Sequence, residues 1–155
     1  AQRRSQMSRI AVHVEIDAPV ARVWELVEPI ENHVDWMADA VAIRVTSSHN
    51  RGIGVTFDCD TKVGPLKLTD KMEIIEWLPG SAMGVSHTGI VTGKGRFTLT
   101  PIRNGEATRF AWEENLRFPI WMGGPITGLI GGSLVMRLIW KRNLKALKKL
   151  VERGA

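Results

Sequence analysis

The sequence predicts an α+β fold, in which an antiparallel sheet packs against one long C-terminal helix. The apolar residues recur at helical spacing only near the start and at the end of the chain. Between about residues 41 and 116 they alternate with polar residues at a period of two, and short turns separate the alternating segments. A run of strands followed by one long helix is typical of a single sheet covered by a helical layer.

The first part of the chain predicts one strand followed by two short helices. Residues 9–16 alternate as a half-buried strand does. Residues 17–28 have apolar side chains at helical spacing, with Asp17 as a cap and Pro19 near the first helical position. A proline ends this helix, and residues 30–37 form a second short helix or turn.

Six further strands follow, each bounded by residues that favour turns. They are predicted at residues 41–45, 55–63, 66–78, 83–88, 95–101 and 110–116. The alternation slips at Ile74 and Ile75, which indicates a bulge or bend in the longest strand. Asn104 and Gly105 have the chemistry of a hairpin turn between the last two strands. Strands joined in this way form an antiparallel meander.

The C-terminal segment joins an uncharged apolar stretch to a basic helix. Residues 118–136 carry no charged side chain, and their prolines and glycines argue against one unbroken membrane-spanning helix. We expect residues 118–132 to act as a lid over a bound ligand. The helix that follows has a broad apolar stripe, with Asn143 near its middle. The stripe consists of Leu134, Val135, Leu138, Ile139, Ala146, Leu147, Leu150 and Val151.

The net positive charge of the chain is concentrated in this helix. Residues 137–153 carry seven basic side chains and one acidic side chain, so their net charge is +6, whereas the whole chain has +5. Two interpretations remain open: a solvated helix face, or a surface that makes transient contact with an anionic membrane. Nucleic-acid binding is not expected, because the chain has no basic patch interleaved with aromatic residues.

Composition and motifs exclude several classes of protein. The length fits a single domain over residues 9–155, with residues 1–8 as a disordered extension. The lone Cys59 excludes an intramolecular disulfide, and no Cys/His cluster has the spacing of a zinc site. Because the sequence has neither the spacing of a zinc site nor a phosphate loop, we expect neither a metal nor a cofactor. The basic start lacks the apolar core of a signal peptide, which makes a cytoplasmic location the default prediction, and no pattern indicates an oligomeric state.

Three segments stand out when they are taken together. They read IDAPVARVWELV at 16–27 with Trp36 after it, TRFAWEENL at 108–116, and LKALKKLVE at 144–152. In this order they resemble the START-like (SRPBCC) superfamily, in its bacterial polyketide cyclase/dehydrase and lipid-transport branch, over residues 9–153. The resemblance implies a helix-grip fold, in which a curved sheet of about seven strands wraps round the C-terminal helix. It also implies a cavity between them, floored by the two short helices, that holds lipids, polyketides or other apolar molecules.

This arrangement assigns candidate ligand-binding residues to the inward strand faces, the helices and the lid. The apolar candidates are Trp36, Phe57, Met72, Val85, Phe97, Trp112, Trp121, Met122 and Ile139. Methionine side chains adapt to varied ligands, and aromatic side chains supply a large apolar surface. The alternative for each of them is an ordinary role in the core.

Polar residues in an inward phase are the clearest indication of function, because buried polar groups need partners. Asp70, His87 and Glu114 share the phase of apolar neighbours, and Asn143 lies on the helical stripe. His87, Glu114 and Asn143 are candidates for orienting a ligand, and Asp70, His87 and Glu114 for acid–base catalysis. The alternative is a relaxed strand end at which the side chain meets water. The acidic and histidine residues between 31 and 39 fit a solvated turn better than a metal site.

The primary hypothesis is therefore binding or carriage of a hydrophobic small molecule, such as a lipid or a polyketide, in an internal cavity. The alternative is a polyketide cyclase/dehydrase-type enzyme that uses acid–base residues of the same cavity. The sequence does not decide between these two functions, and it does not identify the ligand.

Overall fold

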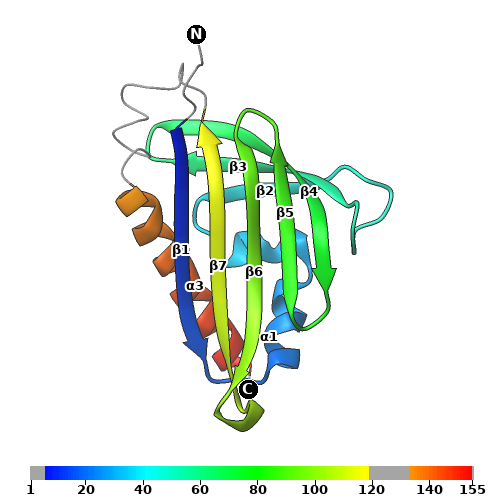
Figure 1. The fold of residues 1–155 in the computed structure, drawn as a ribbon, viewed down its shortest axis with the longest axis vertical. Helices are drawn as coiled ribbons and strands as arrows, with labels where there is room; N and C mark the ends of the chain where they lie inside the picture. The colour runs from blue at the N-terminus through cyan, green and yellow to red at the C-terminus, as the bar shows by residue number, and fades with distance from the viewer. Residues whose placement is uncertain (1–5, 119–132, 155) are drawn as a thin grey trace.

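The computed structural model describes residues 6–118 and 133–154, which form a curved seven-stranded sheet with helices on its concave side (Figure 1). The order across the antiparallel sheet is β1-β7-β6-β5-β4-β3-β2. The strands are β1 Gln6–Ile16, β2 Ala40–Val45, β3 Thr56–Val63, β4 Leu66–Leu78, β5 Ala82–Thr88, β6 Thr92–Ile102 and β7 Ala107–Phe118. The strands from β2 to β7 form a meander, and β1 pairs with β7, so the predicted α+β helix-grip fold is confirmed.

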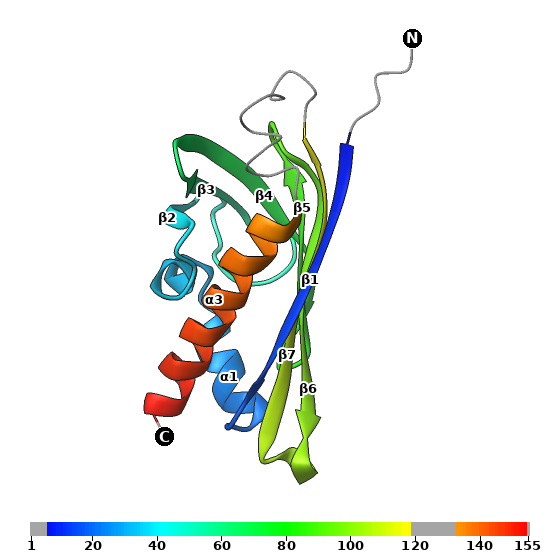
Figure 2. The ribbon, with the colours of Figure 1, turned by 90° about the vertical axis from the view of Figure 1, so that its left-hand side faces the viewer.

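Helices fill the concave side of the sheet. The helix α1 (Val20–Val27) and the 3-10 helix η1 (Ile30–Asp35) follow β1, and α3 (Ser133–Arg153) packs along β1. Figure 2 shows the sheet bending round α3, with β2, β3 and β4 on the far side of the helix from β1. No helix in residues 6–118 and 133–154 is long and apolar enough to cross a membrane.

The buried face of α3 is rotated relative to the predicted stripe. Its buried residues are Met136, Trp140, Asn143, Leu144, Leu147 and Val151. Leu134 and Leu138 are 65% and 53% exposed, so the prediction that they face the core is wrong. At 100° per residue these two leucines lie on the side of the helix opposite to Met136 and Trp140. Contact with the sheet, rather than the sequence pattern of the helix, therefore selects the buried face.

The first strand is longer than the sequence predicts. The backbone of Gln6 pairs with that of Phe118 at the far end of β7, and the pairing continues without interruption to Ile16. Residues 6–8 therefore belong to the sheet and not to a disordered N-terminal extension. The hydrogen bonds that β7 offers along its full length explain this extension, because they give the backbone of β1 partners beyond its apolar residues.

The start of α1 differs from the prediction at its cap. Pro19 occupies the cap position, and no side chain caps the helix. The backbone N–H of Asp17 instead donates a hydrogen bond to Oε1 of Glu152 at 3.0 Å. This bond ties the β1–α1 connection to the last turn of α3. Asp17 thus has its backbone held by a tertiary contact, and its side chain is not needed as a cap.

Two irregularities of the sheet lie where the sequence predicts them. The register between β4 and β5 shifts between Ile74 and Glu76, at the predicted bulge. The short 3-10 helix η2 (Arg103–Gly105) forms the predicted turn between β6 and β7. Asn104 and Gly105 have φ angles of 58° and 84°, a left-handed conformation that these two residue types adopt at low cost.

Candidate functional site

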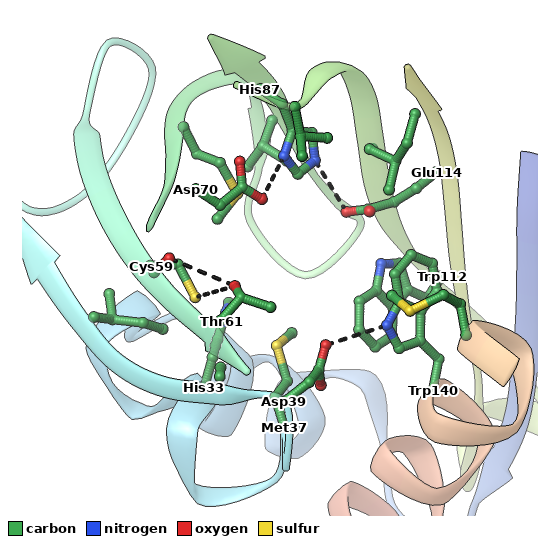
Figure 3. A pocket seen from close by; sticks show the side chains of 18 of the residues that line it. His33, Met37, Asp39, Cys59, Thr61, Asp70, His87, Trp112, Glu114 and Trp140 are labelled. Atoms are coloured by element: carbon green, nitrogen blue, oxygen red, sulfur yellow. Dashed lines mark hydrogen bonds and ion pairs between the residues drawn. The ribbon is translucent and has the colours of Figure 1, made fainter. Parts of the chain in front are cut away.

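A cavity lies between the concave side of the sheet, α3 and the segment that joins η1 to β2 (Figure 3). Its volume is about 120 Å³. Strands β3 to β7 all contribute side chains to the wall, because alternate residues of a strand point to the same face of the sheet. The cavity therefore lies between the sheet and α3, where the resemblance noted in the sequence implies one.

The wall of the cavity is mostly apolar and adaptable. Phe97, Trp112 and Trp140 supply aromatic surface, and the rings of Trp112 and Trp140 stack with centroids 4.2 Å apart. The lining also includes Met37, Met72, Met83 and Met136. A void of about 150 Å³ in another protein admits benzene, so this cavity holds about one ring. A larger ligand requires lining side chains to move, which unbranched methionines do readily.

Eight of the residues proposed from the sequence lie in the wall of this cavity. They are Phe57, Asp70, Met72, Val85, His87, Phe97, Trp112 and Glu114. All of them belong to β3–β7 and have the inward phase that the alternation predicts. Trp121 and Met122, with residues 119–132 of the predicted lid, lie outside the described residues.

The polar side chains of the cavity meet at His87 on β5. Its Nδ1 lies 2.8 Å from Oδ2 of Asp70, and its Nε2 lies 3.3 Å from Oε1 of Glu114. Carboxylates are acceptors, so both ring nitrogens carry a proton and donate. The side chains of His87, Asp70 and Glu114 are 3%, 14% and 10% exposed. The three residues therefore form a buried ionic triad, with one imidazolium between two carboxylates.

A glycine allows Glu114 to reach His87 across an intervening strand. Strand β6 separates β5 from β7, and Gly95 of β6 is the backbone partner of Glu114. A Cβ atom at Gly95 would lie 2.5 Å from both Cγ and Oε1 of Glu114. The side chain of Glu114 thus lies directly over the backbone of Gly95, in space that any other residue would fill. The triad depends on this missing side chain.

The triad holds His87 in its protonated form. Burial, the largest single influence, disfavours the imidazolium and lowers its pKa. The hydrogen bonds and negative charges of Asp70 and Glu114 together outweigh burial and raise the pKa of His87 from 6.5 to about 10. At neutral pH the ring therefore has no lone pair with which to accept a proton. Any proton acceptor of the triad has to be a carboxylate oxygen.

A fully buried carboxylate oxygen of the triad has no hydrogen-bond partner among the described residues. Oδ1 of Asp70 is buried and accepts no hydrogen bond within the described residues, whereas Oδ2 of the same carboxylate is held by His87. An unsatisfied buried carboxylate oxygen is costly. A ligand that donates a hydrogen bond to this oxygen would remove the cost, which makes Asp70 the natural point of polar contact.

A second polar group, at the junction of η1, β2 and α3, is structural. Nδ2 of Asn143 donates to Oδ1 of Asp39 at 2.7 Å, and Oδ1 of Asn143 accepts from the backbone N–H of Ala38 at 3.0 Å. Nε1 of Trp140 donates to Oδ2 of Asp39 at 3.4 Å. Asn143 therefore joins α3 to the start of β2, and it lies outside the lining, contrary to the prediction. Asp39 is part of the lining, although the sequence analysis placed it in a solvated turn.

Trp36 and Ile139 also lie outside the lining, contrary to the prediction. Trp36 packs behind the wall, where its ring contacts those of Phe97 and Trp112 with centroids 5.7 Å and 6.1 Å away. Ile139 is half-buried, because the rotation of α3 turns its neighbours Met136 and Trp140 toward the cavity instead. Both residues belong to the helical parts of the fold, where the orientation of a face depends on tertiary contacts.

His33 lies in the lining and is buried, which overturns the interpretation of its segment as a solvated turn. Its ring nitrogen Nε2 donates to the backbone carbonyl of Val27 at 2.7 Å. Burial lowers the pKa of His33 from 6.5 to about 4, against the opposing effects of this hydrogen bond and of Glu31. His33 is therefore a neutral residue of the cavity wall, and the sequence offers no signal for it beyond its position in the short helix.

Cys59 and Thr61 also line the cavity, although the sequence analysis did not propose them as site residues. They share the inward phase of Phe57 on β3, and this phase was the signal that would have found them. The hydroxyl of Thr61 lies 3.7 Å from the sulfur of Cys59. Burial raises the pKa of the Cys59 thiol from 9.0 to about 11, so the thiol stays protonated at neutral pH.

The described residues contain no group of three or more His, Cys, Asp and Glu side chains that could hold a metal ion. In the triad both carboxylates are directed at the imidazole nitrogens, which leaves these nitrogens unavailable as ligands.

The comparison with protein families extends over nearly the whole chain. The model of a family described as polyketide cyclase/dehydrase and lipid transport matches residues 7–152. Together with the solved structures described next, this match confirms the START-like resemblance noted in the sequence. No curated protein matches the chain.

Solved structures reproduce the fold at low sequence identity. A START superfamily protein from Mycobacterium smegmatis has a TM-score of 0.75 and 12% identity, covering 95% of this chain and 99% of its own. The Zhui aromatase/cyclase from a Streptomyces species has a TM-score of 0.72 and 15% identity, and the match covers 96% of this chain and 95% of that protein. Protein TTHA0849 from Thermus thermophilus has a TM-score of 0.75 and 19% identity, and the match covers 96% of this chain and 99% of that protein. At these identities the likeness shows a shared fold alone.

Proposed function

Because this chain belongs to the polyketide cyclase/dehydrase and lipid transport family, we propose that it binds a hydrophobic small molecule in its internal cavity. The observation that carries the proposal is the distribution of polarity in the wall. Apolar side chains form most of it, and the triad of Asp70, His87 and Glu114 occupies one place in it. Sites of this kind bind by apolar burial and orient the ligand with a few polar groups.

The energetics of the cavity support an occupant. An unfilled void costs about 24 cal/mol per Å³, so a volume of about 120 Å³ corresponds to about 3 kcal/mol if it stays empty. A ligand removes this cost and adds about 25 cal/mol for each Å² of apolar surface that it buries. Because only the folded chain has the cavity, binding raises the free energy of unfolding.

The experiment that tests this proposal is binding with a variant that fills the cavity. A panel of fatty alcohols, sterols and aromatic polyketides is titrated while tryptophan fluorescence and Tm are followed. We expect saturable binding and a rise in Tm for at least one ligand class. Val85→Phe fills the cavity and weakens that binding about tenfold or more, whereas Val41→Phe, at an exposed position of β2, leaves it unchanged. Absence of saturable binding throughout the panel would contradict the proposal.

A second candidate function is acid–base catalysis in the same cavity, as in a polyketide cyclase/dehydrase-type enzyme. The observation that favours it is Oδ1 of Asp70, which is buried without a partner beside an imidazolium. In a dehydration, this carboxylate would take the proton from the carbon next to a ligand carbonyl. The electron pair of that C–H bond forms the new double bond as the bond from the neighbouring carbon to its hydroxyl group breaks. The hydroxide leaves as water with the proton that Asp70 took, which restores the carboxylate.

A split between turnover and binding distinguishes the enzyme from the carrier. If Asp70 is the base, Asp70→Asn abolishes conversion of a hydroxy-ketone polyketide analogue while the affinity for the analogue changes only a few fold. Loss of affinity to the same extent as any conversion favours binding alone. Asp58→Asn is the matched control, because it removes a carboxylate from β3 at a position out of phase with the cavity lining.

We also propose transient contact of α3 with an anionic membrane surface. The exposed side chains of Leu134 and Leu138 lie on the helix that carries seven of the 21 basic side chains and a net charge of +6. Apolar side chains beside cations favour the interface of anionic bilayers. Cosedimentation with phosphatidylserine vesicles should occur at low salt and decline at high salt. Leu134→Ser with Leu138→Ser should weaken it, while Val41→Ser should not.

A further inference from the structure

We infer that the cavity selects ligands whose polar group is a neutral or cationic hydrogen-bond donor, such as an alcohol, a phenol or an amine, and excludes carboxylate-bearing lipids. This inference rests on the proposed binding function and adds the chemical class of the ligand. It stands on three observations: the charges that line the cavity, the saturation of the triad's cation, and the buried oxygen of Asp70 that has no partner among the described residues.

Carboxylates outnumber cations in the wall of the cavity. Asp39, Asp70 and Glu114 line it, and His87 is the cation that the triad holds there. The two carboxylate oxygens of Asp39 accept hydrogen bonds from Asn143 and Trp140. Both donors are neutral, so these bonds bring no positive charge to offset that of Asp39. The interior therefore carries a net negative charge, in a place where water screens it only weakly.

Two other basic residues of the lining do not change this balance. The guanidinium of Arg96 pairs with Glu76, with Nε 3.1 Å from Oε1, and the Arg96 side chain is 50% exposed. The positive charge of Arg96 is thus already paired with the carboxylate of Glu76, and the side chain of Arg96 is half exposed to solvent. His33 is neutral at neutral pH, because burial lowers its pKa to about 4. Neither side chain offers a buried positive charge to an anionic ligand.

The imidazolium of His87 cannot receive an anionic headgroup either. Both of its N–H groups already donate to carboxylates, at 2.8 Å to Asp70 and at 3.3 Å to Glu114. A ligand carboxylate would have to displace one of these partners, and it would then lie beside two or more negative charges. Like charges brought together in a poorly screened site repel strongly.

The hydrogen-bonding capacity that remains at the triad is that of an acceptor. Oδ1 of Asp70 is buried in the cavity wall and has no partner among the described residues. A hydroxyl or ammonium group satisfies this oxygen by donating to it, and a carboxylate has no hydrogen to donate. Charge and hydrogen bonding thus select the same class of ligand.

Three probes of one shape test the inference at neutral pH: 4-butylbenzyl alcohol, 4-butylbenzylamine and 4-butylbenzoic acid. Each has the single ring that the cavity volume allows, and they differ in the polar group. Dissociation constants come from calorimetry and tryptophan fluorescence. We expect the alcohol and the amine to bind at least about tenfold more tightly than the acid. Binding of the acid as tight as that of the alcohol would overturn the inference and leave the proposed function standing, whereas failure of all three to bind would overturn both.

Variants assign the selectivity to Asp70. In Asp70→Asn the preference for the amine over the acid should fall about tenfold or more, because a carboxylate is replaced by an amide of similar shape. Asp58→Asn makes the same change in net charge at a position of β3 outside the lining, and should leave the preference unaltered. An equal change in both variants would mean that the overall charge of the protein, and not the cavity, sets the preference. The comparison of probes on the unmodified chain needs no variant to fold.

Discussion

Oε1 of Glu114 lies 3.3 Å from Nε2 of His87, although β7 and β5, which carry these residues, are not neighbours in the sheet. The strand between them offers only the backbone of Gly95 at the crossing point. Two polar residues on separate strands can therefore share a buried ion pair because a third position has no side chain.

Gly95→Ala should break the contact between Glu114 and His87. The added Cβ would lie 2.5 Å from Cγ and Oε1 of Glu114, so this side chain has to move. We expect a loss of about 1–3 kcal/mol in the free energy of unfolding and a lower pKa for His87, measured by NMR titration. Gly84→Ala is the control: its Cβ would crowd Glu76, which is not part of the triad. An unchanged pKa of His87 in Gly95→Ala would refute the role of Gly95.

His87 should make the protein less stable as the pH rises above neutral. Its pKa is raised from 6.5 to about 10 in the folded chain, so the folded state keeps a proton that the unfolded state loses. The stabilisation is complete below pH 6.5 and declines as the pH approaches 10. Urea unfolding between pH 6.5 and 9 measures it, since the Cys59 thiol begins to titrate in unfolded chains near 9.0. His87→Gln should flatten this profile.

His33 should produce the opposite trend in mild acid. Burial lowers its pKa from 6.5 to about 4. Between these two pH values His33 is protonated in the unfolded chain and neutral in the folded chain. Stability should therefore fall with decreasing pH, by at most about 1.4 kcal/mol per pH unit from this residue. His33→Gln should remove this part of the slope, whereas His13→Gln, at an exposed position of β1, should retain it. The same slope in all three proteins would contradict the assignment.

Asn143→Leu should destabilise the fold without acting on the cavity directly. The substitution keeps the approximate volume but leaves Oδ1 of Asp39 and the backbone N–H of Ala38 without their partner. A fully buried group left unsatisfied costs about 1–3 kcal/mol; because Ala38 is exposed and Asp39 only half-buried, we expect a loss near the lower end of this range, measured by urea titration. Asn115→Leu, at an exposed position of β7, is the matched control and should change stability little. Full stability of Asn143→Leu would show that these bonds contribute nothing.

The strands of this protein can be predicted from sequence further than its helices can. Alternation fixes which residues of a strand share a face, and so it assigned Asp70, His87 and Glu114 to the inside of the sheet. It does not fix which inward residues touch. The predicted meander places β6 between β5 and β7, but the triad also depends on the missing side chain at Gly95, which the phase of the strands does not reveal.

The helix α3 shows why the rest was not predictable. Its leucines at 134 and 138 belong to an apolar pattern that fits a buried stripe, yet the structure buries Met136 and Trp140 instead. The stacking of Trp140 on Trp112 of β7 and the hydrogen bonds of Asn143 determine this rotation. These partners are distant in sequence, so a helical period alone cannot select between two faces of similar hydrophobicity.

The pairing of β1 with β7 also sets the order in which the chain can fold during synthesis. Val12 faces Trp112, so the first strand leaves the ribosome roughly one hundred residues before its partner does. Until then its backbone groups and apolar side chains remain available to other chains or to chaperones. Stable closure has to await translation of β7, and docking of α3 on β1 comes later still, because α3 follows β7 in the chain.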